Sequence, residues 1–264
     1  MVIDRLTKLY ENEFQGVDYN PEYDQIYRSV NYYHTNEDEK ELLRPMLLLL
    51  SCEMFGGDNR QALNPAIALQ MLYNSSLIHE DIIDEIQHRS NSETVQQKFG
   101  KSEAIITGDI MFIIGFKYLS NVDDKHFQNV MKVFNQTASM MIEGKQMELY
   151  LRDSENISLE KYLTCIEYKS ASTFAAASKI GAILADASEK NQNLVYNFGN
   201  DLGVAIQLKR DLKNYLHLNF KEDMDFETII WEKYHQAMKY LDEIDANENF
   251  KKQLIELVDY KFKQ

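Results

Sequence analysis

A short acidic segment, residues 77–85 with the sequence LIHEDIIDE, carries the side chains best suited to chemistry. Glu80 and Asp84 are four positions apart, and Asp81 and Asp84 are three apart, so on a helix their carboxylates point toward one region. Like charges held this close repel one another, and a divalent cation removes the repulsion. Carboxylate oxygens suit Mg²⁺, which keeps several waters and bridges substrate phosphates. The segment therefore predicts a magnesium site that serves a phosphate group; a solvated acidic helix face is the alternative.

The residues before these acids favour a substrate with a hydrocarbon chain. Positions 71–76, which read MLYNSS, are apolar or small on the stripe that ends at Glu80. Carboxylates at the mouth of an apolar shaft are unusual for a solvated helix face, which is normally polar along its whole length. A lipid diphosphate needs this combination, because its head binds metal and its tail requires apolar surface.

The elements that must position these side chains are predicted to be long helices. The chain has 3 prolines and 10 glycines, and no proline follows Pro65. Proline and glycine punctuate strands and turns, so their scarcity favours helices. In residues 63–83, apolar side chains recur three to six positions apart, which also indicates a helix. We expect an all-α fold of about ten helices.

Turn-forming residues divide the predicted helices. Such residues favour turns or helix caps, and they gather at residues 56–59, 90–92, 121–124, 153–157 and 188–192. Asn156 and Ser158 are both candidates to cap the helix that follows them. The sequence contains no repeat, low-complexity tract or linker, so we predict a single domain over residues 1–264.

Composition and charge exclude several classes of protein. With 264 residues, the chain is long enough for one large domain with a substantial core. Its formal net charge of −14 argues against a nucleic-acid partner. Cys52 and Cys165 form no zinc-type spacing and are expected to be buried thiols. The N-terminus lacks an apolar signal core, and the longest apolar runs, 46–50 and 110–116, are too short to span a bilayer. We therefore expect a cytoplasmic protein without a transmembrane segment.

Beyond the acids, residues 77–109 read LIHEDIIDEIQHRSNSETVQQKFGKSEAIITGD and resemble the trans-polyprenyl diphosphate synthase family. The family's pattern is roughly LIHDDxxDxxxxRRGxPTxHxxFGxxxAIxxGD. The likeness extends over about residues 40–220 in the right order, which excludes chance. Further matching segments are LRPMLLLL (43–50), FGG (55–57), EGKQMEL (143–149), YLTCIEYKSAS (162–172) and FGNDLGVAIQLKRDLKNY (198–215).

The resemblance implies the isoprenoid synthase fold, a bundle of helices around a central cavity. It also implies an enzyme that ionises an allylic prenyl diphosphate with two or three Mg²⁺ ions, and that forms a homodimer. Metal ions and cationic side chains would stabilise the charge that builds on the departing diphosphate. An apolar pocket that excludes water would shelter the carbocation that remains.

The resemblance assigns roles to individual residues of this chain. Glu80, Asp81 and Asp84 match the first acidic motif, which binds magnesium. Arg89 matches a donor for the allylic diphosphate, and Lys169 matches the lysine that also holds it. Lys169 is therefore expected to take part in catalysis as well as in binding.

Further roles fall on two glutamines and on a second motif. Gln146 and Gln207 match polar side chains of the cavity, where a glutamine can face the developing cation. In the second motif, Asp211 and Asn214 remain as oxygen ligands for metal, whereas Arg210 replaces a carboxylate. Since a guanidinium binds phosphate well, we expect Arg210 to reach the diphosphate; loss of one metal is the alternative. Gln207 and Arg210 are thus expected to be catalytic.

The site that the family uses for isopentenyl diphosphate is altered in this chain. Glu41 and Leu42 replace cations, Tyr73 replaces a histidine, and Ser90 replaces an arginine. Each charge-assisted phosphate contact contributes about 1.5–3 kcal/mol, so ordinary elongation with isopentenyl diphosphate is not expected. Arg44 remains as a substrate-binding cation. The ring face of Tyr73 is suited to stabilise a carbocation in the cavity.

The hydrocarbon pocket is expected to be deep. Ser75 and Ser76 lie about one helical turn before Glu80. In the family, bulky residues at these positions shorten the product, so two serines imply a substrate of about C15–C20 or longer.

Four functions remain open on the sequence. The best supported is a terpene synthase-like lyase or cyclase on the polyprenyl synthetase scaffold, because the first motif is intact while the second substrate site is altered. The others are a prenyltransferase with a non-standard acceptor, an elongating synthase with a relocated isopentenyl site, and a non-catalytic subunit of a prenyl diphosphate synthase. His88 and Lys40 flank the altered positions and would partly serve a relocated site. Retention of Arg89, Lys169 and Gln207 argues against the non-catalytic subunit.

Overall fold

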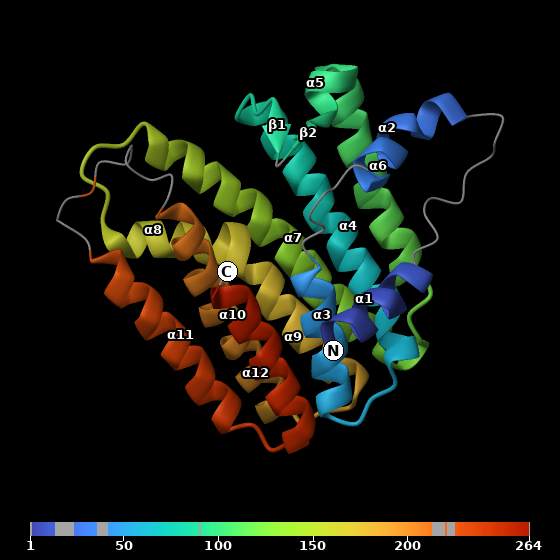
Figure 1. Cartoon of the computed structure of the whole chain (residues 1–264), viewed down its shortest axis with the longest axis vertical. Helices are drawn as coiled ribbons and strands as arrows, with labels where there is room; N and C mark the ends of the chain where they lie inside the picture. The colour runs from blue at the N-terminus through green and yellow to red at the C-terminus, as the bar shows by residue number, and fades with distance from the viewer. Residues whose placement is uncertain are drawn as a thin grey trace. The chain divides into compact units, whose positions relative to one another are not determined.

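The computed structural model describes residues 2–13, 24–35, 42–89, 91–212, 220 and 225–263. In this part of the chain the backbone forms α-helices α1–α12, the π-helix η2 and one two-stranded hairpin, β1–β2 (Figure 1). The expected all-α fold is therefore confirmed. None of the described helices combines the length and the hydropathy that crossing a bilayer requires. The single domain stays a prediction, because backbone contacts group the chain into two compact units.

The first unit comprises Met1–Met46 and Leu63–Asp123. The unit boundaries fall inside α3 and α4, so both helices belong partly to the second unit. Within the first unit, α2, α5 and α6 pack against one another. Its elements are α1 (Val2–Glu13), α2 (Asp24–Thr35), α3 (Leu43–Met54), α4 (Asn59–Ile83), β1 (His88–Arg89), β2 (Ser92–Glu93), α5 (Val95–Phe99) and α6 (Lys101–Leu119).

Helix α4 carries the acidic segment at its C-terminal end, and its middle is buried on every side. Residues 65–72 are all buried, including Pro65 inside the helix. A helix that is enclosed in this way has no single apolar stripe. This explains why the apolar residues of the segment recur at uneven spacings. Buried polar side chains pair within the helix, since Gln70 Nε2 donates a hydrogen bond to Asn74 Oδ1 at 2.9 Å.

The second unit comprises Leu47–Ala62 and Asp124–Gln264. Helix α10 packs against α9 and α11, and η2 packs against α7 and α10. Helices α8, η2 and α9 follow one another without a break. The elements of this unit are α7 (Asp124–Arg152), α8 (Leu159–Ile166), η2 (Glu167–Ala171), α9 (Ser172–Leu184), α10 (Glu189–Asp211), α11 (Phe226–Asp242) and α12 (Glu248–Lys263).

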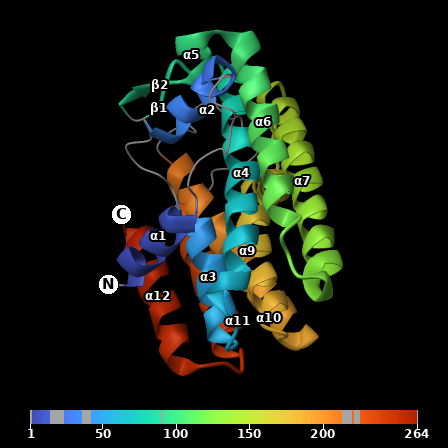
Figure 2. The same cartoon turned by 90° about the vertical axis from the view of Figure 1, so that its right-hand side faces the viewer.

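Small residues allow the helices of the second unit to approach closely. Helix α9 is buried along almost its entire length, and α7 and α10 lie beside it in both views (Figure 1 and Figure 2). A Cβ atom at Gly181 of α9 would lie 2.3 Å from the carbonyl oxygen of Leu48. No side chain fits at that distance, so a larger residue would force the backbones apart.

Helix boundaries follow the expected turn residues. The breaks at 56–59, 121–124 and 153–157 all fall at helix junctions. Of the two candidate caps for α8, the structure selects Ser158, whose hydroxyl accepts a hydrogen bond from the backbone N–H of Lys161 at 3.4 Å. Asn156 instead takes a φ of 60°, a left-handed conformation that asparagine tolerates in turns.

Both cysteines are buried free thiols, as expected. Burial raises the pKa of Cys52 to about 12 and that of Cys165 to about 11. Thiols with such pKa values stay protonated at neutral pH and are poor nucleophiles. Neither cysteine is therefore a candidate for covalent catalysis.

Candidate active site

The first acidic motif lies at the end of α4, next to an arginine from the β1–β2 hairpin. Asp81 is the most buried of the three acids, with 4% of its side chain exposed, and Arg89 Nε donates a hydrogen bond to Asp81 Oδ1 at 2.6 Å. Glu80 and Asp84 are partly exposed. The structure thus brings Asp81, one of the predicted metal ligands, into contact with Arg89, the cation assigned to the allylic diphosphate.

Two side chains near the start of α5 hold the end of α4 in place. Gln96 Nε2 donates to the carbonyl oxygens of Asp81 at 2.5 Å and of Ile86 at 2.8 Å, and Thr94 Oγ1 donates to the oxygen of Ile86 at 2.8 Å. The last carbonyls of a helix have no partner within it. The Asp81 carbonyl accepts from the backbone N–H of Ile86 at 3.0 Å and from Gln96, and these bonds tie the end of α4 to the start of α5. The sequence assigned no role to Gln96 or Thr94, although Thr94 matches the threonine of the family pattern. Spacing does not show which carbonyl oxygen a side chain binds.

Burial dominates the electrostatics of Asp81. It raises the pKa of the Asp81 carboxyl from 3.8 to about 6, although Arg89 opposes the shift; the charges of Glu80 and Asp84 raise the pKa further. A carboxylate that is buried with incomplete charge compensation favours a cationic ligand. This position therefore has the electrostatic character expected of a metal ligand.

Replacing Asp81 by Asn is expected to stabilise the metal-free protein by about 1–3 kcal/mol near neutral pH, because the ionised carboxylate is costly to bury. The pKa of Asp81 is higher in the folded protein than in the unfolded chain, so the wild-type protein loses stability as the pH rises from 3.8 through about 6. The advantage of Asp81→Asn is thus full above about pH 6 and disappears toward pH 4. Urea unfolding of both proteins with a chelator, at pH values on either side of this window, measures it. Equal stability near neutral pH would mean that Arg89 compensates the charge completely.

The donor chemistry at this end of α4 fits magnesium. Glu80, Asp81 and Asp84 offer only oxygen ligands. Over the described residues, no three acidic, histidine or cysteine side chains are already gathered around one point. Mg²⁺ usually binds through one or two carboxylates together with waters and substrate phosphates, so a complete protein cage is not required. Asn214, another predicted ligand, lies outside the described residues.

Arg44 and Tyr73 are engaged with each other. The Arg44 guanidinium carbon lies 3.5 Å from the centre of the Tyr73 ring, and Arg44 is 1% exposed. This is a buried cation–π contact, which stabilises the guanidinium away from water. Leu42 is also buried, whereas Glu41 and Ser90 lie outside the described residues. A substrate-binding role for Arg44 and Tyr73 stays a prediction.

The two serines predicted to deepen the pocket differ in their surroundings. Ser75 is buried, and Ser76 is half-buried. The hydroxyl of Ser76 donates a hydrogen bond to the carbonyl oxygen of Tyr73 at 2.7 Å, within its own helix. Both side chains are small and leave room beside α4. The expected length of the substrate's hydrocarbon chain, about C15–C20 or longer, stays a prediction.

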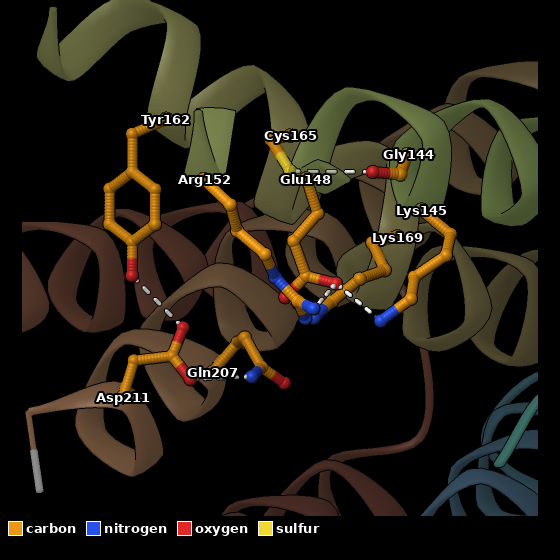
Figure 3. Close-up of polar contacts among 9 residues, drawn as sticks. All are labelled: Gly144, Lys145, Glu148, Arg152, Tyr162, Cys165, Lys169, Gln207 and Asp211. Atoms are coloured by element: carbon orange, nitrogen blue, oxygen red, sulfur yellow. Dashed lines mark hydrogen bonds and ion pairs between the residues drawn. The ribbon is translucent and has the colours of Figure 1, made fainter. Parts of the chain in front are cut away.

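In the second unit, four charged residues of α7 and η2 form what we call the Glu148 cluster: Lys145, Glu148, Arg152 and Lys169 (Figure 3). Lys145 Nζ donates to one carboxylate oxygen of Glu148 at 2.7 Å, and Lys169 Nζ donates to the other at 2.8 Å. Arg152 Nη2 lies 3.4 Å from Glu148 Oε2. Burial alone would raise the pKa of Glu148, but Lys169 and Lys145 hold it below its ordinary value.

Lys169 reaches this cluster through an irregular helical turn. The π-helix η2, Glu167–Ala171, widens the helix between α8 and α9, and such turns are frequent at functional sites. The backbone of η2 packs on Gly144 of α7. A Cβ atom at Gly144 would lie 2.3 Å from the backbone nitrogen of Lys169. The Sγ atom of Cys165 lies 3.4 Å from the Gly144 oxygen. Gly144 therefore permits the close approach that brings Lys169 to Glu148.

Replacing Gly144 by Ala is expected to destabilise the fold by about 1–3 kcal/mol, because the added methyl group overpacks the contact with η2. It should also displace Lys169 and lower kcat/KM for an allylic diphosphate by about tenfold. Urea unfolding and the rate of diphosphate release measure the two effects. Gly181→Ala is the matched control, since it overpacks a contact with Leu48 instead and should reduce stability without changing kcat/KM. If kcat/KM fell equally in both variants, the contact of Gly144 with η2 would not be what positions Lys169.

The second motif places one buried acid beside Gln207. Asp211 is 6% exposed, and its two oxygens accept hydrogen bonds from Gln207 Nε2 at 2.8 Å and from the Tyr162 hydroxyl at 3.0 Å (Figure 3). The Tyr162 ring packs edge-on against Phe226. Arg210 is exposed at the end of α10. Gln207 and Asp211 are thus brought together as predicted site residues, and Tyr162 is an additional member that the sequence did not indicate.

Gln146 does not lie where it was predicted. It is exposed, on the same stripe of α7 as Ile142 and Tyr150, whose exposed fractions are 72% and 69%. Its neighbour Lys145 points to Glu148 instead. One position along an α-helix rotates the side chain by about 100°, so adjacent residues face different surroundings. The burial of this stripe does not support the assignment of Gln146 to the cavity, which stays a prediction, and Lys145 is the buried neighbour.

Comparison with known proteins gives a consistent result. The family model described as polyprenyl synthetase matches residues 24–224. A geranylgeranyl diphosphate synthase of Sulfolobus acidocaldarius is 30% identical over 184 residues, which are 68% of this chain and 56% of that protein. A geranylfarnesyl diphosphate synthase of Methanosarcina mazei is 34% identical over 176 residues, which are 67% of this chain and 58% of that protein.

Among solved structures, a crystal structure of a geranylgeranyl pyrophosphate synthase matches with a TM-score of 0.85 and 25% identity. The match covers 100% of this chain and 98% of that chain, and it confirms the isoprenoid synthase fold. In sequence, the chain spans a little over half the length of the two curated relatives.

Proposed function

The chain belongs to the polyprenyl synthetase family, and from this premise we propose that it is a magnesium-dependent enzyme that removes diphosphate from an allylic prenyl diphosphate. The observation that carries the proposal is the acidic end of α4. There a buried carboxylate, Asp81, has two further acids in its segment, is bound by Arg89 and has a raised pKa. Such a site is stabilised when a divalent cation and a phosphate group bind to it.

The residues of the chain supply binding and charge stabilisation for this reaction. Bound magnesium would act as a Lewis acid that stabilises the departing diphosphate. Glu80, Asp81 and Asp84 would hold the metal. Arg89 and Lys169 would donate hydrogen bonds to diphosphate oxygens, and these bonds strengthen as negative charge builds in the transition state. No covalent enzyme intermediate is required.

The finer proposal is a terpene synthase-like lyase or cyclase. Arg44, which remains in its segment together with Lys40, is buried beneath the Tyr73 ring, and Leu42 is buried as well. Together with the altered positions Glu41 and Ser90, this leaves few cations for a second diphosphate. A lyase needs none, because the allylic cation loses a proton or takes up water.

A prenyltransferase is the second candidate. The two curated relatives are named as synthases of geranylgeranyl and geranylfarnesyl diphosphate. If the chain shares their activity, it condenses an allylic diphosphate with isopentenyl diphosphate. The acceptor would then bind through cations other than those at the altered positions.

One assay separates the candidates. The protein is incubated with Mg²⁺ and geranyl, farnesyl or geranylgeranyl diphosphate, with and without isopentenyl diphosphate, and the products are measured by mass spectrometry. Diphosphate and a hydrocarbon or alcohol without isopentenyl diphosphate support the lyase. A longer prenyl diphosphate that appears only with both substrates supports the prenyltransferase. No release under any condition, with activity only after a partner synthase is added, would contradict both.

We also propose that the protein forms a homodimer through α6. Three isoleucines of this helix are exposed although they are large and apolar, namely Ile105 at 46%, Ile106 at 55% and Ile113 at 63%. An exposed apolar group of this kind is typical of an interface. Replacing Ile113 by Glu is expected to convert a dimer into a monomer, as measured by light scattering after size exclusion. A wild-type monomer at all concentrations would refute the interface, and Lys252→Glu at an exposed lysine of α12 serves as the charge control.

A further inference from the structure

Lys233 of α11 lies between two acids that belong to other helices of the second unit, Asp201 of α10 and Glu167 of η2. Its Nζ atom donates a hydrogen bond to Asp201 Oδ1 at 2.8 Å and lies 3.9 Å from Glu167 Oε1. We infer that Lys233 is a positioning residue, which holds η2 against α10 and thereby keeps Lys169 in place. The inference rests on the proposed function, in which Lys169 binds the diphosphate of the substrate.

The two ion pairs of Lys233 differ in burial. The side chain of Asp201 is 10% exposed, that of Lys233 is 27% exposed and that of Glu167 is 33% exposed. A carboxylate as buried as Asp201 requires a counter-charge, which Lys233 supplies through a hydrogen bond. The pair with Glu167 is longer and more exposed, so by itself it contributes little to the stability of the fold. Asp201 therefore fixes the Lys233 ammonium, and from this fixed position the ammonium attracts η2.

The π-helix η2 is a single turn whose shape depends on its neighbours. Turns of this type are rare and lie within longer α-helices, as η2 does between α8 and α9. Helix α10 packs against both η2 and α11 (Figure 1). The start of η2 faces α10, since the charge of Glu167 adds to burial in raising the pKa of the Tyr196 hydroxyl on α10. Lys233 thus acts on the first residue of η2, and Lys169 lies two positions further along the same turn.

The charges explain what the loss of Lys233 would do. Glu167 and Asp201 are both within ion-pair distance of the Lys233 nitrogen, so the two carboxylates are near each other. Without the ammonium between them, like charges in a partly buried place repel. The repulsion acts between α10 and the start of η2, and it would displace the turn that carries Lys169. A donor that moves away from developing charge stabilises the transition state less.

The test begins with steady-state kinetics of the full chain, with Mg²⁺ and farnesyl or geranylgeranyl diphosphate. Lys233→Met is expected to lower kcat/KM about tenfold, mainly through kcat, and Lys233→Arg should retain most of it. Adding Glu167→Gln to Lys233→Met should restore kcat/KM to within about threefold of wild type, because one of the two repelling charges is removed. Lys239→Met, at an exposed lysine of the same helix, is the control and should leave kcat/KM unchanged.

A second background separates positioning from general destabilisation. If Lys233 acts through Lys169, Lys233→Met should cause no further loss of kcat/KM in a chain that already carries Lys169→Met. A destabilised fold would instead lower the rate in either background. A further tenfold loss in the Lys169→Met chain, or no recovery with Glu167→Gln, would overturn the inference.

Hydrogen exchange gives a readout that does not depend on activity. In Lys233→Met, the backbone amides of residues 167–171 should exchange faster than in wild type, whereas those of α12 should exchange at the same rate. Unchanged exchange in η2, or equal acceleration in η2 and α12, would show that Lys233 does not hold this turn in particular. Failure of the proposed function would appear separately, as a wild-type protein that releases no diphosphate although Lys233→Met still accelerates exchange in η2.

Discussion

Replacing Asp81 by Ala is expected to slow diphosphate release from an allylic prenyl diphosphate by about a thousandfold or more, because a metal ligand is lost from the charged transition state. Asp81 is the buried acid of the first motif, and its position is set by the bonds of Gln96 and by Arg89. The loss should not be repaired by excess Mg²⁺ if the metal requires this carboxylate. The measurement is kcat/KM over a range of Mg²⁺ concentrations.

The control for this experiment is Asp123→Ala, which removes an exposed acid between α6 and α7 and should leave the rate unchanged. The expected stabilisation of Asp81→Asn makes a further contrast, since a variant that is more stable and yet inactive cannot owe its inactivity to unfolding. Retention of magnesium-dependent turnover in Asp81→Ala would show that the metal is held elsewhere.

Replacing Lys169 by Met is expected to lower kcat/KM by about 10²–10³, the usual cost of removing one preorganised donor from a developing negative charge. Methionine keeps much of the length and the apolar stem of lysine but cannot donate a hydrogen bond or carry charge. Because the charge on the diphosphate grows as the carbon–oxygen bond breaks, kcat should fall more than KM rises. Steady-state kinetics with farnesyl or geranylgeranyl diphosphate provide the test.

Lys179→Met is the matched control for Lys169, since it removes a lysine ammonium whose recorded contacts are with Asn193 and the Tyr196 ring. Its kcat/KM should equal that of wild type. If Lys169→Met changed only KM, the ammonium would contribute to ground-state binding and not to ionisation. If it changed neither constant, Lys169 would not touch the substrate.

Local spacing predicted the parts of the site that lie within one element. Glu80 and Asp81 lie on the last turn of α4 and Asp84 directly follows the helix, as the helical pattern of the segment predicted. That the three carboxylates converge on one metal stays a prediction. The scarcity of proline and glycine indicated that helix, and the turn residues at 56–59 and 153–157 mark junctions in the structure. Arg89, which the resemblance assigns to the allylic diphosphate, lies beside Asp81 in the structure, and its role in binding stays a prediction.

Positions that depend on helix rotation or on remote partners were predicted less well. Gln146 was assigned to the cavity, but it is exposed, and Lys145 points inward. The resemblance matched the segment correctly but did not decide which of two adjacent polar residues faces the interior. Gln96 and Tyr162 were missed because their hydrogen-bond partners, Asp81 and Asp211, lie 15 and 49 positions away.

By itself, the sequence determined that the chain is an all-α member of the polyprenyl synthetase family, because composition, motif order and helical period are properties of local sequence. It also predicted a metal site at Glu80, Asp81 and Asp84, which stays a prediction. The tertiary structure alone decided how the charges are partnered. Gly144 admits the η2 backbone and so brings Lys169 to Glu148, and Arg44 is buried against Tyr73. These contacts join residues far apart in the chain, and their distances depend on how whole helices pack, which no local pattern encodes.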